Sequence, residues 1–321
     1  MKILFITATR IGDAVLSTGL LHHLIRQHSN ARITVVCGRP AAPLFGAAPS
    51  VERVIALDKM VWSLHWLEMW TRCVTTAWDM VVDLRRTPLS HLLRATRSRH
   101  LGRNRETVHR VVKLAGILDL EADPPAPRIW VGSAQERLAQ GCVPDGLPVL
   151  AIGPAANWAA KTWPAANFAA LAARLTARKG ILPGARIAIF GRDDERPQVL
   201  EVIEAVPVKR RLDLVGRLDL LEVFACLRRC AMYIGNDSGL MHLAAASGIP
   251  TLGLFGPSPE QHYAPWGPLC GVVRASKGYD EIFPPGFDHR NTGTLMDSLS
   301  VDAAEDAARE LWQRAAEAGG A

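Results

Sequence analysis

The chain has 321 residues, 49% hydrophobic and 21% charged, which indicates a folded protein with room for two domains and excludes a disordered chain. Its formal net charge of +6 favours an anionic partner: nucleic acid, a phosphorylated small molecule or an acidic membrane surface. No apolar run approaches the roughly 20 residues that span a bilayer. The six cysteines form no C-x-x-C or Cys/His cluster, so we predict no zinc site and a reducing compartment.

Strands and helices alternate through the first half of the chain. The opening MKILFITATR is apolar for too few residues to be a signal peptide and instead predicts a strand. Hydrophobic spacing predicts strands over 3–6, 33–36, 53–57 and 80–84, and helices over 12–27 and 107–118. This alternation is typical of a parallel sheet with helices on both faces.

Two unusual segments lie within this half. Trp62, Trp66 and Trp70 recur at every fourth position, which predicts a helix over 61–70 with one aromatic face. That face either packs in the core or rests on a membrane surface, where indole rings favour the interface. Seven arginines then occur between Arg85 and Arg105 without an acidic residue among them. They indicate either a solvated basic face or a docking site for a polyanion.

A Gly/Pro-rich stretch over 141–148 predicts a domain boundary, giving a first domain of residues 1–145 and a second of 146–321. The second domain repeats the α/β pattern, with strands over 149–153, 186–190, 213–216, 231–234, 251–255 and 271–273, and helices over 164–179, 196–205, 220–229 and 301–318. The final helix is assigned to the second domain, and packing against the first domain is the alternative.

Three loops carry candidate functional residues. Asp13 follows the first strand, where a carboxylate can act as a general base or simply cap the next helix. Lys161 directly precedes a helix, whose positive dipole end would repel it unless an anion were bound; the alternative is a solvated lysine. Asp237, Ser238 and Gly239 begin a small-residue helix, whose N-terminus suits a phosphate, although capping alone is the simpler explanation.

Neither G-x-G-x-x-G nor G-x-x-x-x-G-K-[ST] occurs in the chain, which disfavours dinucleotide and P-loop sites. Several motifs do occur in order: RIGDAVLST, GPAA ahead of KTWP, FGRDDE, LVGRLDLLE, and NDSGLMHLAAASGIPTLGLFGPSPEQHYAPWGP. With these motifs the chain resembles the heptosyltransferases of glycosyltransferase family nine, which assemble the lipopolysaccharide core.

The resemblance implies a GT-B fold: α/β, with two facing Rossmann-like domains, parallel sheets and an interdomain cleft. The first domain would bind the acceptor and the second the nucleotide sugar. The implied activity is an inverting, metal-independent transfer of heptose from ADP-heptose to a hydroxyl of the lipid-linked inner core. No cofactor beyond the ADP-sugar co-substrate and no nucleic-acid partner is implied. The protein would work in the cytoplasm, peripherally at the inner face of the cytoplasmic membrane.

The same resemblance implies roles for individual residues. Asp13 would deprotonate the acceptor, and Lys161 would neutralise the leaving diphosphate. The donor would be held by Glu195 at the ribose, Leu218 near the adenine, Asp237 and His242 at the sugar and phosphates, and Ser238, Gly239 and Leu240 at the helix N-terminus. We expect the acceptor's anionic groups to meet Arg10, Arg85, Arg86, Arg103 and Arg105. The alternatives are a different nucleotide sugar or acceptor, a non-catalytic nucleotide-binding protein, and an oxidoreductase.

Overall fold

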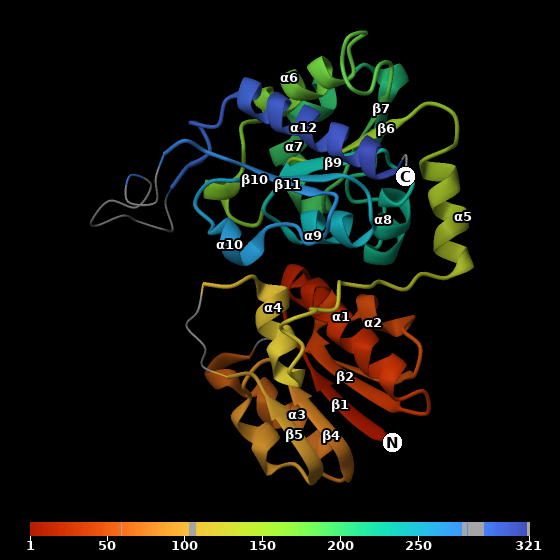
Figure 1. The fold of residues 1–321 in the computed structure, drawn as a ribbon, viewed down its shortest axis with the longest axis vertical. Coiled ribbons are helices and arrows are strands. Elements are labelled where there is room, and N and C mark those ends of the chain that lie inside the picture. The colour runs from red at the N-terminus through yellow and green to blue at the C-terminus, as the bar shows by residue number, and fades with distance from the viewer. Residues whose placement is uncertain (59, 103–106, 278–280, 282–291, 320–321) are drawn as a thin grey trace. The chain divides into compact units, whose positions relative to one another are not determined.

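The computed structural model describes residues 1–58, 60–102, 107–277, 281 and 292–319. The chain divides into two compact units, Met1–Gly132 and Ser133–Ala321, and each contains its own β-sheet (Figure 1). All strand pairs in both sheets are parallel, as the alternation of strands and helices predicts.

The first unit has the sheet order β3-β2-β1-β4-β5. Strand β1 lies in the middle, and its residues from Ile3 onwards are completely buried. The order reverses between β1 and β4, so this is the point where α/β sheets bind ligands at the carboxyl ends of their strands. The elements are β1 (Lys2–Ile6), α1 (Ile11–Gln27), β2 (Arg32–Gly38), η1 (Arg39–Ala41), α2 (Pro43–Gly46), β3 (Val51–Leu57), η2 (Val61–Ser63), α3 (His65–Cys73), β4 (Trp78–Asp83), η3 (Pro88–Leu92), β5 (Ala95–His100), α4 (Arg110–Ala115) and η4 (Gly116–Leu118).

The second unit has the sheet order β11-β10-β9-β6-β7-β8, which is the doubly wound dinucleotide-fold order with β6 as its first strand. Its reversal point lies between β6 and β9. The elements are α5 (Ser133–Cys142), β6 (Val149–Gly153), η5 (Ala159–Lys161), α6 (Ala165–Leu175), β7 (Arg186–Ile189), η6 (Asp193–Glu195), α7 (Arg196–Ala205), η7 (Val208–Arg210), β8 (Arg211–Asp213), α8 (Leu220–Leu227), β9 (Met232–Asn236), α9 (Gly239–Ala246), β10 (Thr251–Phe255), α10 (Glu260–Tyr263), β11 (Cys270–Arg274) and α12 (Val301–Gly319).

The boundary between the units lies at 132/133, whereas the sequence placed it after residue 145. The difference is helix α5, which the sequence did not predict and which packs against α8 of the second unit. Ala139 of α5 is completely buried, and Arg228 at the end of α8 pairs with Glu136 at 3.2 Å. The polar sequence SAQERLAQGC has too few apolar residues for its helical period to be evident.

The predicted helix over 61–70 is only partly correct. Helix α3 begins at His65, and the residues before it form the short turn η2, in which Trp62 and Ser63 have left-handed φ angles of 55° and 58°. Trp66 and Trp70 pack partly buried against the core of the first unit. Trp62 is exposed, so the three indoles do not share one face.

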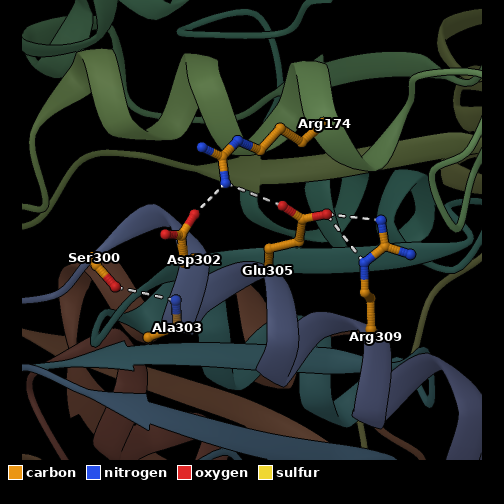
Figure 2. A network of polar contacts seen from close by, with 6 residues as sticks. All are labelled: Arg174, Ser300, Asp302, Ala303, Glu305 and Arg309. Carbon is orange, nitrogen blue, oxygen red and sulfur yellow. Dashed lines mark hydrogen bonds and ion pairs between the residues drawn. The ribbon is translucent and has the colours of Figure 1, made fainter.

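The C-terminal helix α12 packs on α6, β10 and β11, so its contacts place it in the second unit. Figure 2 shows the charged groups that hold it. Arg174 of α6 reaches both Asp302 and Glu305 of α12, and Arg309 binds the other oxygen of Glu305 at 2.7 Å. These hydrogen bonds, Arg309 first, hold the pKa of Glu305 below its ordinary value. The buried face beneath them comprises Ala304, Ala308 and Leu311.

Glycines let β6 and β9 approach closely at the reversal point. Tyr233 on β9 is completely buried, and its hydroxyl occupies the space beside Gly153 and Gly235. A Cβ on Gly153 would lie 2.1 Å from the Tyr233 hydroxyl and 2.9 Å from Leu240 Cδ2. These positions therefore require glycine for space.

Gly153→Ala is expected to lower the free energy of unfolding by about 2–3 kcal/mol, because overpacking a dense core costs roughly that much. Urea unfolding of the full chain measures the change. Tyr233→Phe in the same chain should restore part of the loss, since the hydroxyl is the nearest atom. The matched control is Gly141→Ala in α5, where a Cβ would meet nothing within 4 Å. Equal stability of the Gly153 and Gly141 variants would contradict the packing explanation.

Candidate active site

The carboxyl edge of the second sheet brings Lys161 and Asp237 together. Lys161 ends η5 in the loop after β6, and Asp237 follows β9, the neighbouring strand. Lys161 Nζ donates to Asp237 Oδ2 at 2.5 Å, and their side chains are only 24% and 8% exposed. The sequence predicted both residues but not their pairing. The anion that Lys161 requires is, at least in part, this carboxylate of the protein itself.

Asn236, the last residue of β9, fixes the Lys161 loop in place. Its side chain accepts a hydrogen bond from Trp163 N at 3.1 Å and donates to Pro154 O at 2.8 Å. The completely buried indole of Trp163 donates to Leu299 O at 2.9 Å. The sequence motifs contained Asn236 and Trp163, but the interpretation gave neither a role. They hold the loop so that Lys161 is positioned before any ligand arrives.

Two buried hydroxyls at this edge have no hydrogen-bond partner among the described residues: that of Thr162, after β6, and that of Ser258, after β10. The hydroxyls of Tyr233 on β9 and Ser238 after it lie close enough to interact with each other. Ser238 is the N-cap of α9, yet its side chain makes no capping bond, and the first backbone N–H groups of α9 have no partner within the helix. Buried polar groups are normally satisfied, so this concentration indicates where a polar ligand binds.

The remaining donor residues predicted from the sequence lie on the same unit. Gly239 and Leu240 form the first turn of α9, and His242 is buried one turn later. Glu195 ends η6 after β7, where its carboxylate accepts the Arg192 N–H at 2.8 Å. Leu218 is half-buried after β8. All of them therefore lie in loops or helix starts at one edge of the sheet, and they extend from β9 across to β8.

On the first unit, Asp13 lies in the first turn of α1. The N-cap of that helix is Arg10, so Asp13 is not the capping residue. Arg110, at the start of α4, places its Nε 3.5 Å from Asp13 Oδ1. Both side chains are mostly buried. The sequence gave no signal for Arg110, because nothing in it shows that α4 packs against α1.

Asp83 shapes the loop that presents two of the predicted acceptor arginines. It is completely buried at the end of β4 and accepts hydrogen bonds at 2.7 Å from the backbone N–H groups of Arg85 and Thr87. Arg85 and Arg86 are exposed, as is Arg10 after β1. Arg103 and Arg105 lie outside the described residues. The sequence interpretation missed Asp83, although a carboxylate ending an apolar strand is a signal for such a loop.

A histidine pair adjoins this loop. His100 Nδ1 lies 3.7 Å from Asp83 Oδ2, and its ring stacks on His91 with centroids 3.8 Å apart. Burial, and then the neighbouring His91, lower the pKa of His100 below its ordinary 6.5, while Asp83 opposes the shift.

Because the folded state holds this proton more weakly than the unfolded state, His100 does not affect stability above pH 6.5 and destabilises the fold as pH falls below it. We therefore expect the melting temperature to fall on acidification below pH 6.5, and His100→Asn to flatten that slope. His91→Asn should flatten it partly, since it removes one cause of the shift. An unchanged slope in His100→Asn would contradict the assignment.

Within the described ranges, no group of three or more His, Cys, Asp or Glu side chains is arranged to hold a metal ion. No helix in the described part of the chain is long and apolar enough to cross a membrane.

Comparison with known proteins agrees with this architecture. The model of glycosyltransferase family 9 (heptosyltransferase) matches residues 54–281. Lipooligosaccharide heptosyltransferase 2 of Haemophilus influenzae is 27% identical over 315 residues, covering 87% of this chain and 90% of the relative.

Two solved structures share the fold. The glycosyl transferase family 9 protein from Veillonella parvula has a TM-score of 0.80 at 21% identity, covering 97% of each chain. The Escherichia coli ADP-heptose lps heptosyltransferase II has a TM-score of 0.76 at 20% identity, covering 98% of this chain and 99% of that one. These likenesses confirm the predicted GT-B class. Because the family model covers most of its length, the chain belongs to glycosyltransferase family 9, the heptosyltransferases.

Proposed function

We propose that the protein transfers a heptose from ADP-heptose to a hydroxyl of the lipopolysaccharide inner core, with inversion at the anomeric carbon. The observation that carries this proposal is the Lys161–Asp237 pair beside the unpartnered N-terminus of α9. A helix N-terminus and an adjacent ammonium group suit a diphosphate. Membership of the heptosyltransferase family supports heptose as the transferred sugar.

The proposed reaction is a single displacement. Asp13 takes the proton of the acceptor hydroxyl while that oxygen forms a bond to the anomeric carbon. The bond from the anomeric carbon to the diphosphate breaks, and its electron pair leaves with ADP. Lys161 has three N–H donors and uses one on Asp237, so others remain for the phosphate oxygens. No step requires a metal ion or a further cofactor.

We assign the donor-binding residues to the second unit and the acceptor-binding residues to the first. Glu195 and Leu218 would hold the ribose and adenine, and Asp237 and His242 the sugar and phosphates, with Ser238, Gly239 and Leu240 at the helix N-terminus. Arg10, Arg85, Arg86, Arg103 and Arg105 would bind the anionic acceptor. The protein would act in the cytoplasm, at the inner face of the cytoplasmic membrane.

ADP is expected to stabilise the protein more than UDP, GDP or NAD. A ligand at 100 times its dissociation constant adds about 2.7 kcal/mol, which raises the melting temperature by roughly 5–10 °C for a unit of this size. Differential scanning calorimetry measures the shift. A larger shift in melting temperature with UDP or GDP would mean that the donor is a different nucleotide sugar. A larger shift with NAD would favour an oxidoreductase. Product analysis with ADP-heptose and inner-core acceptor then separates a transferase from a non-catalytic nucleotide-binding protein.

A further inference from the structure

The first unit has a concentrated group of exposed apolar side chains. We call it the apolar patch; it comprises Met60, Val61, Trp62, Leu64 and Leu67, with Leu92 on η3, which packs against α3. Trp62 is 93% exposed and Val61 76% exposed. Contiguous exposed apolar surface on a folded unit usually marks an interaction site.

The rest of the same segment packs normally. Met69 and Cys73 of α3 are completely buried in the core of the first unit, and Trp66 and Trp70 cover that core. Trp62 is separated from them by the left-handed backbone at Trp62 and Ser63, a conformation that bulky residues rarely adopt. This turn directs the indole away from the core that the neighbouring tryptophans cover.

The apolar patch lies at the carboxyl edge of the first sheet, because η2 follows β3 and η3 follows β4. Exposed Arg10, Arg85 and Arg86 follow β1 and β4 at the same edge, and none has an acidic partner within the described ranges. Acidic residues of the neighbouring segments already have partners. Asp83 accepts the backbone N–H groups of Arg85 and Thr87, Asp58 pairs with Arg39, Glu68 with Arg72, and Asp13 with Arg110.

Apolar side chains beside unpaired arginines match the surface of an anionic bilayer. Indole rings favour the bilayer interface, and arginines near it are attracted to acidic headgroups. A second copy of the chain would fit less well. In a two-fold contact the same patch meets itself, which would bring the unpaired arginines of both copies together.

We propose that the apolar patch docks on anionic phospholipid, with Trp62 and Val61 entering the interface, while Arg10, Arg85 and Arg86 meet the anionic groups at that surface, those of the lipid-linked acceptor included. Docking extends the proposed function, and it rests on that function in one respect only, the identity of the lipid-linked acceptor. Asp13 follows β1 at the same edge as the patch. Docking would therefore hold the general base on the face of the unit that meets the lipid.

Co-sedimentation of the full chain with vesicles tests the proposal. We expect binding to vesicles of equal parts phosphatidylglycerol and phosphatidylcholine, and weak binding to phosphatidylcholine alone. Trp62→Asp and Val61→Asp should each weaken binding to the anionic vesicles about tenfold or more, because each loses the burial of one apolar side chain and adds a negative charge. Both side chains are exposed, so neither variant removes a core contact.

The matched control is Val208→Asp on η7 of the second unit, because Val208 has the same 76% exposure as Val61. It should bind like the wild type. Equal weakening by Val208→Asp, or wild-type binding by Trp62→Asp, would overturn the proposal. The proposal would also be overturned if sedimentation velocity showed a dimer that Trp62→Asp converts to monomer while vesicle binding stays unchanged.

Turnover on a delipidated inner-core acceptor separates this proposal from the proposed function. Trp62→Asp should retain wild-type turnover on that substrate. Absence of transfer by the wild type would refute the function and leave the vesicle result intact, whereas unchanged vesicle binding by Trp62→Asp refutes docking alone.

Discussion

Lys161→Met is expected to lower kcat by about 10²–10³-fold, the usual effect of removing one preorganised partner of a developing negative charge. The same change removes the partner of Asp237, whose side chain is 8% exposed. An unpaired buried carboxylate should cost about 3–5 kcal/mol of stability. Steady-state kinetics at saturating donor and thermal unfolding measure the two effects separately.

The double variant Lys161→Met/Asp237→Asn separates structure from catalysis. An amide needs no counter-ion, so the double variant should regain most of the lost stability. It should not regain turnover, because the positive charge is still missing. Recovery of both quantities together would mean that Lys161 acts only by supporting the loop, and would contradict its catalytic role.

Asp13→Asn is expected to lower kcat by about 10²–10⁴-fold, because asparagine cannot accept the proton of the acceptor hydroxyl. Stability should fall by only about 1–2 kcal/mol, since Asp13 is not the N-cap and the change removes its charge near the helix N-terminus and its ion pair with Arg110. Calorimetry and single-turnover kinetics check both expectations.

Asp79→Asn is the matched control for this substitution. Asp79 is an exposed aspartate near the amino end of β4, at the opposite edge of the same sheet. The Asp79→Asn variant should turn over substrate at the wild-type rate. Wild-type turnover by Asp13→Asn would refute the base assignment and favour a non-catalytic role for the first unit.

Elements with a strong hydrophobic signal could be predicted from the sequence. The strands over 149–153 and 251–255 and the helix over 196–205 have the predicted bounds, because turn residues border each apolar run. Strand β5 was missed since its four central residues are exposed and polar, as an edge strand allows. The Trp spacing predicted a longer helix than the left-handed turn at η2 permits.

The candidate site could be predicted as single residues but not as contacts. Lys161 and Asp237 are 76 positions apart, and only the adjacency of β6 and β9 brings them together. The same holds for Asp13 and Arg110, whose approach depends on α1 packing against α4. A single sequence does not encode strand order in any local pattern, so such pairs remain hidden in it.

Helix α5 determines where the second unit can be separated as an independent folding domain. A fragment starting at residue 146 would lack α5 and leave one side of α8 uncovered, including contacts made by the buried Ala139. The fragment would also lose the partners of Arg228 and Arg229, namely Glu136 and the Val143 carbonyl. Newly exposed apolar surface of this kind promotes aggregation. The compact second unit begins at Ser133, so a fragment made to measure ligand binding to this unit should start there and keep α5.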